Sequence, residues 1–189
     1  MIDTTPVLAH AAGHTIIRAV VGDHELGLQF PDGIYDADDY VARCSDASWV
    51  AFGAGFTPDE QAAFLNRLCM DVSGYVGESV FAEPDSMLFF TGPGWHRVGR
   101  SELVRAASKC EAFAGTFNIP VPLVLEACME VVDTTLRKYQ DVADRMFRVL
   151  LEGRRLDGYR FAALLAAIKE EDLSLAVRKR LGIEMGESS

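Results

Sequence analysis

The sequence predicts a mainly α protein with a small β-sheet (α+β). Most of its 189 residues lie in stretches where apolar side chains recur every three or four positions, the period of a helix that buries one face. Two short apolar runs, His24–Phe30 and Ser48–Phe52, are instead typical of strands, and Pro31-Asp32-Gly33 forms a turn after the first. We therefore expect helices to build the core and the short strands to form a sheet beside them.

Length and composition fit one soluble domain, residues 1–189, with the sheet and first helices in 1–100 and a helical bundle in 101–185. The net charge of −10 argues against a nucleic acid partner, because phosphate binding needs a basic face. No apolar run approaches the roughly 20 residues of a membrane span. No signal peptide is evident, and the four cysteines form no C-x-x-C pair. We expect a cytoplasmic protein with reduced thiols and leave homo-oligomerisation open.

The first half of the chain carries clear helix boundaries. Thr5 and Pro6 form an N-cap and first helical residue, and Gly22-Asp23 end that helix. Thr57-Pro58-Asp59-Glu60 is a capping box that begins a helix reaching about Phe81. This helix contains Gly74 and Gly77, and each costs about 1 kcal/mol of helix stability relative to alanine. That cost indicates close packing against another element.

The second half is predicted to be helical throughout. Ser101 should cap a helix that continues to about Phe113. The longest helix should run over about 121–151 and end before Gly153. Two shorter helices are expected at 159–169 and 173–181. The loop before Ser101 contains His96.

The most informative stretch is His10-Ala11-Ala12-Gly13-His14 in the first helix. Two histidines four residues apart lie on one helix face, one turn apart, so both imidazoles can reach one metal ion. This is the histidine spacing of the H-E-x-x-H zinc site, in which the glutamate is the general base. Here the spacing is kept, but Ala11 stands in place of the glutamate.

Further motifs extend this likeness along the chain. Leu8–Ile17 resembles the H-E-A-G-H signature of the FtsH-type zinc peptidase domain, and Leu26–Pro31 is similar to the strand that receives substrate there. Ser73–Glu78 resembles that domain's G-G-x-x-A-E segment, and Glu78 matches its glutamate. The resemblance implies a zincin-like peptidase domain that uses Zn2+ and acts on protein or peptide substrates, without the family's membrane span and AAA ATPase module. It also implies substrate binding at Leu26, Gly27 and Leu28.

The resemblance implies a third zinc ligand, an aspartate at the start of a distant helix. Alignment back from the following helix places Glu102 there, whereas alignment forward from Thr91-Gly92 places His96 there. Because helices keep register better than loops, we favour Glu102, although either residue type can bind zinc. Glu78 is expected to hydrogen-bond a ligand imidazole.

Ala11 implies that the chain as written is nearly inert. Alanine cannot take a proton from a zinc-bound water, and losing a positioned acid or base costs of order 10² to 10⁴ in rate. The alanine is either an engineered substitution in an active peptidase, which we favour because the rest of the motif is kept, or natural. In the second case the protein is a pseudo-peptidase that works as a non-catalytic protein-binding module.

Overall fold

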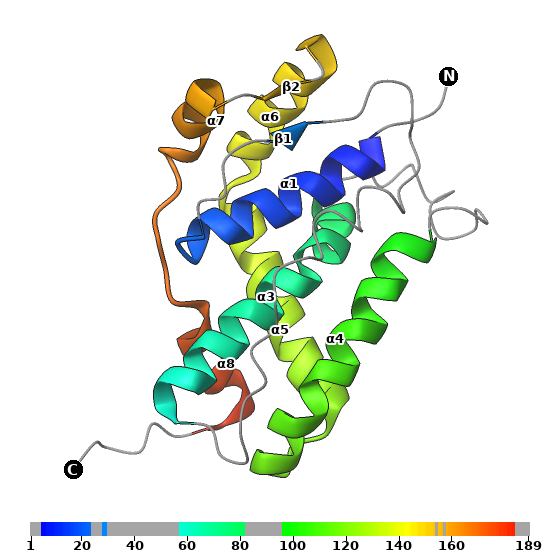
Figure 1. The fold of residues 1–189 in the computed structure, drawn as a ribbon, viewed down its shortest axis with the longest axis vertical. Helices are drawn as coiled ribbons and strands as arrows, with labels where there is room; N and C mark the ends of the chain where they lie inside the picture. The colour runs from blue at the N-terminus through cyan, green and yellow to red at the C-terminus, as the bar shows by residue number, and fades with distance from the viewer. Residues whose placement is uncertain are drawn as a thin grey trace.

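The computed structural model describes residues 5–23, 28–29, 57–81, 96–153, 155–156 and 158–183 (Figure 1). In chain order its elements are α1 (Thr5–Val20), β1 (Leu28–Gln29), α3 (Pro58–Phe81), α4 (His96–Phe117), α5 (Val121–Lys138), α6 (Gln140–Gly153), β2 (Arg155–Leu156), α7 (Gly158–Leu165) and α8 (Leu173–Leu181).

The described part of the chain is all-α, so the predicted α+β fold with a small sheet is wrong. The one pairing of extended segments described joins β1 to β2 antiparallel, with Leu28 opposite Leu156 and Gln29 opposite Arg155. Two residues on each side are too few to bury a face, so helices alone form the core. The predicted strand at 48–52 lies outside the described residues.

Helix α1 is buried on nearly all sides and packs most closely on α3. Its backbone approaches α3 at Gly13, where an added Cβ would lie 2.2 Å from the carbonyl oxygen of Ser73. A Cβ on Gly77 would lie 2.6 Å from the carbonyl oxygen of Ala9. The close packing predicted from the glycines of α3 is therefore confirmed: Gly77 lets the backbones of α1 and α3 come within contact distance, and Gly74 lies against the imidazoles of α1.

Helix α3 is the centre of the molecule, because α1, α4, α5 and α8 all pack on it (Figure 1). The ring of Phe64 on α3 stacks on that of Phe113 on α4, with 5.2 Å between centroids. The predicted capping box is confirmed at the start of α3. The Thr57 amide donates to Glu60 Oε2 over 2.7 Å, and the Glu60 amide donates to Thr57 Oγ1 over 3.3 Å.

Several predicted helix boundaries need correction. Helix α4 ends at Phe117 rather than at about Phe113, and the helix predicted over 159–169 ends at Leu165. The long helix expected over 121–151 is interrupted at Tyr139, which separates α5 from α6. The Tyr139 side chain is buried at this break, and its hydroxyl accepts a hydrogen bond from the Lys169 amide over 3.2 Å. Helix α4 begins at His96, earlier than the predicted cap at Ser101.

None of the described helices is by itself long and apolar enough to cross a bilayer. The segments 102–117 and 121–138 meet the requirement only when taken together, and a bend of 111° separates them.

Candidate metal centre

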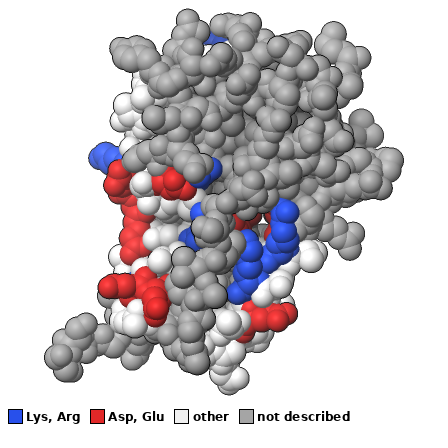
Figure 2. Space-filling view, viewed as in Figure 1, with Lys and Arg blue, Asp and Glu red and all other residues white. Residues whose placement is uncertain are grey.

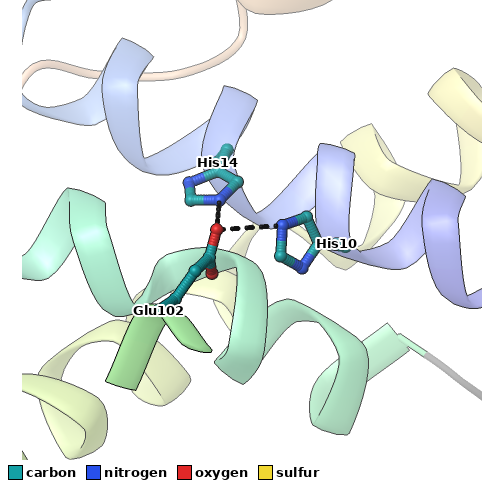
Figure 3. Close-up of side chains that lie close together, drawn as sticks. All are labelled: His10, His14 and Glu102. Carbon is teal, nitrogen blue, oxygen red and sulfur yellow. Dashed lines mark hydrogen bonds and ion pairs between the residues drawn. The ribbon is translucent and has the colours of Figure 1, made fainter. Parts of the chain in front are cut away.

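The two histidines of α1 point toward α4 across α3 (Figure 3). They are four positions apart on the helix, so their rings lie one turn apart, with 4.8 Å between centroids. Only 2% of His10 is exposed. From α4, Glu102 brings Oε1 to 3.3 Å from His10 Nε2 and 3.2 Å from His14 Nε2. The fold thus joins residues 88 positions apart in sequence at one buried point.

The residues brought together are the predicted ligands. Among the described side chains, His10, His14 and Glu102 form the one group whose donor atoms could hold a metal ion. The carboxylate of Glu102 is 6% exposed, and its Oε2 has no hydrogen-bond partner in the described part of the chain. The competing candidate, His96, begins α4 about 9 Å further along the helix, and its side chain lies outside the described residues.

Distances between the donor atoms fit a small metal ion. Zinc binds histidine nitrogen at about 2.0–2.1 Å and carboxylate oxygen at about 2.0–2.2 Å, which makes the edge of a regular tetrahedron about 3.3 Å. The separations of Glu102 Oε1 from the two imidazole nitrogens, 3.3 and 3.2 Å, match that edge. These two pairs already have the separation that a shared ion needs, and all three donor atoms lie within 4.8 Å of one another.

Gly74 of α3 provides the space for such an ion. A Cβ at this position would lie 2.5 Å from His14 Nε2 and 2.6 Å from His10 Nε2, far inside van der Waals contact. It would lie closer still, 2.4 Å, to His10 Cε1. The two imidazoles can therefore converge over α3 only because residue 74 has no side chain.

Hydrogen bonds on the far side of each ring orient both Nε2 atoms toward this space. His10 Nδ1 lies 2.6 Å from Glu78 Oε1, and His14 Nδ1 donates to the Met70 carbonyl oxygen over 3.0 Å. A ligand imidazole held through its second nitrogen has a defined tautomer and ring orientation. The predicted hydrogen bond from Glu78 to a ligand histidine is confirmed.

The pKa values of His10 and Glu102 are shifted in opposite directions, as expected for an ion pair. Burial lowers the pKa of His10, but hydrogen bonds and charges from Glu102 and Glu78 outweigh it and raise that pKa to about 9. Burial raises the pKa of Glu102, but the two imidazoles outweigh it and lower that pKa to about 2. Without a metal ion, a proton on His10 compensates the Glu102 carboxylate, and a cation would have to replace this proton.

The position of the expected general base is fully buried. Ala11 is 0% exposed and offers no group that could exchange a proton. Asp71 on α3 lies close enough to His14 to feel its charge, but its Oδ2 already binds Lys109 Nζ over 3.0 Å, and Arg67 lies 3.9 Å from its Oδ1. Figure 2 shows Lys and Arg side chains beside acidic atoms near the middle of the face in view. Asp71 is thus held by its neighbours and does not replace the missing glutamate.

The predicted substrate-binding strand is only partly described. Leu26 and Gly27 lie outside the described residues, and Leu28 pairs with Leu156 in β1–β2. Substrate binding at Leu26, Gly27 and Leu28 therefore stays a prediction.

Two contributors to the site were not predicted. The Met70 carbonyl is a backbone acceptor, which side-chain identity cannot reveal. The steric role of Gly74 did leave a signal, since glycine inside a long helix is costly, but its partner on α1 was not evident.

Comparisons of the chain with protein-family models, with curated proteins and with solved structures found no match. The FtsH-type resemblance therefore rests on the sequence motifs, and the candidate centre rests on its own geometry.

Proposed function

We propose that this chain is a zinc-binding domain of the metallopeptidase type, with His10, His14 and Glu102 as the ligands. The observation that carries the proposal is the convergence of three donor atoms on the space that Gly74 leaves open. Two histidines and one carboxylate, with a fourth position left for water or substrate, are the donor set of catalytic zinc sites. The substrate class proposed from the sequence resemblance is protein or peptide.

The residues of the chain have separable roles in this proposal. Glu78 and the Met70 carbonyl hold the ligand rings, and Gly74 keeps the ion's place open. Bound zinc would supply Lewis acidity, polarising a carbonyl and lowering the pKa of a bound water to about 7. Ala11 provides no base, so we propose that hydrolysis is disabled at this one position.

A second candidate function, a natural pseudo-peptidase that binds a protein partner without cutting it, is favoured by the burial of Ala11. A glutamate carboxylate at this 0% exposed position would be stable only where it could reach the metal or another polar group. Alanine needs no such partner, so the burial of this position fits a chain in which alanine is the natural residue.

Zinc content of the purified full chain tests the proposal. Elemental analysis after loading and desalting should give about one zinc per wild-type chain and near zero for His14→Ala. The matched pair Glu102→Gln and His96→Gln identifies the third ligand, because only the first should lose zinc. Melting curves of all variants check that they fold. A wild-type chain without zinc, or a His14→Ala protein that keeps it, would disprove the proposal.

A further inference from the structure

Behind His14, on the side away from Glu102, lies a small triangle of hydrogen bonds. Ser73 Oγ lies 2.7 Å from the Met70 carbonyl oxygen and 3.0 Å from His14 Nδ1. The same carbonyl oxygen is 3.0 Å from His14 Nδ1. Ser73 is 0% exposed, so water does not compete for these contacts.

The geometry determines where the protons of the triangle are. A carbonyl oxygen can only accept, so the short contact from Ser73 Oγ to Met70 uses the hydroxyl proton. Neither partner then has a proton to give to His14 Nδ1. The ring nitrogen must carry its own proton and share it between the two oxygens, which leaves Nε2 as the atom that faces Glu102 and the open space.

The backbone of Ser73 is fixed as firmly as its hydroxyl. Its carbonyl oxygen packs where Gly13, the residue before His14, has no side chain. Ser73 therefore contacts α1 twice, through its backbone at Gly13 and through its hydroxyl at His14. Because Ser73 is held at both points, its hydroxyl cannot move with the His14 ring, and rotation of that ring would break their contact.

We propose that Ser73 is a positioning residue that fixes the tautomer and the ring angle of His14. The two ligand histidines are then held differently: His10 by the carboxylate of Glu78, and His14 by two neutral oxygens. The consequence for metal binding rests on the proposed function, but the orientation of His14 itself is a property of the metal-free chain.

The test compares Ser73→Ala with Ser79→Ala in the full chain. Ser79 lies on the same helix and bonds back to the Tyr75 carbonyl oxygen over 3.4 Å, but it is exposed and is not hydrogen-bonded to either ligand histidine. Competition with a chromophoric chelator measures zinc affinity, and visible absorption of the cobalt(II) form reports ligand geometry. Ser73→Ala should bind zinc about 10- to 100-fold more weakly, with an altered cobalt spectrum, because partners behind a ligand imidazole have effects of that size. Ser79→Ala should match wild type.

A metal-free measurement keeps this inference separate from the proposed function. In NMR spectra of the wild-type chain with chelator, the Nδ1 proton of His14 should be visible and slow to exchange, and Ser73→Ala should shift or remove it. Ser73→Thr, which keeps the hydroxyl, should restore both the signal and the affinity if its melting curve shows that it folds. Unchanged affinity, cobalt spectrum and Nδ1 proton in Ser73→Ala would overturn the role of Ser73. A wild-type chain that binds no metal would overturn only the zinc proposal, and the proton signal would still decide the inference.

Discussion

At the scale of single residues, a substitution at Gly74 tests metal binding without removing any of the three ligands. Gly74→Ala keeps all three ligands, but its Cβ would lie 2.5 and 2.6 Å from the two Nε2 atoms, so the imidazoles cannot keep the positions from which they face Glu102. We predict that zinc binding is abolished, measured by elemental analysis. The imidazoles must also shift, so the metal-free protein should lose roughly 1–3 kcal/mol of stability, as overpacked cores do. Gly115→Ala is the matched control, because nothing lies within 4 Å of its added Cβ. Normal zinc content in Gly74→Ala would show that the ion does not use this space.

Ala11 decides between the two proposed functions. In Ala11→Glu we expect zinc to stay, since the residue is not a ligand, and peptide hydrolysis to rise at least 10²-fold, the typical contribution of a general base. Burial of the position means that the variant should melt at a lower temperature without zinc than with it, because the new carboxylate needs a partner. A fluorogenic peptide library, read with and without chelator, measures the gain. A folded, zinc-loaded Ala11→Glu protein that cleaves no peptide would favour the pseudo-peptidase.

At the scale of elements, the contact between α1 and α3 is the one that the site depends on. Gly77→Ala would place a Cβ 2.6 Å from the Ala9 carbonyl oxygen and 2.8 Å from the Gly13 Cα, and both are backbone atoms that cannot turn aside. We predict a loss of stability of about 1–3 kcal/mol or more, measured by chemical denaturation of the chelator-treated protein. Zinc affinity should fall as well, because α1 carries both histidines. Equal stability of Gly77→Ala and the control Gly115→Ala would contradict the close packing.

The elements also show what the sequence could and could not predict. The start of α3 was predictable because the capping box of Thr57 and Glu60 is a local interaction. The position of Glu102 near the two histidines was predictable because a helix keeps its register over several turns. The break at Tyr139 was not, because the apolar period of the sequence continues through it, and the hydrogen bond that its side chain receives comes from Lys169, 30 residues away. The pairing of Leu28 with Leu156 is likewise non-local, and it joins only two residues on each side, so the predicted sheet is reduced to this short pairing in the described chain.

At the scale of the whole molecule, the site makes stability depend on pH in opposite directions with and without metal. In the metal-free protein the pKa of His10, raised to about 9, stabilises the fold below pH 6.5, and this contribution is lost as the pH rises through 9. The pKa of Glu102, lowered to about 2, adds stability above pH 4.5 that is lost as the pH falls through 2. Zinc must displace the proton of His10, so its affinity should rise about tenfold per pH unit toward pH 9.

Denaturant unfolding at pH 6 and pH 8.5 measures both effects. With chelator, we expect the midpoint to fall between pH 6 and pH 8.5. The extra stability conferred by a fixed excess of zinc should grow over the same interval. In His10→Ala, the midpoint of the metal-free protein and the stabilisation by zinc should both change much less between pH 6 and pH 8.5. A midpoint of the metal-free protein that rises with pH would show that His10 and Glu102 are not a charged pair in the folded state.

The separation of the ligands along the chain has a topological consequence. An ion shared by His14 and Glu102 is a cross-link that closes a loop across 88 residues. Closing a loop of that length permanently would reduce the entropy of the unfolded chain by an amount equivalent to about 4–5 kcal/mol. While the ion stays bound, α1 and α4 cannot separate, and the segments after residue 102, which lie outside the loop, are the first that can detach. Under mechanical pulling from the two termini, the loaded chain should therefore extend in two steps, and the loop should be released only when the ion leaves.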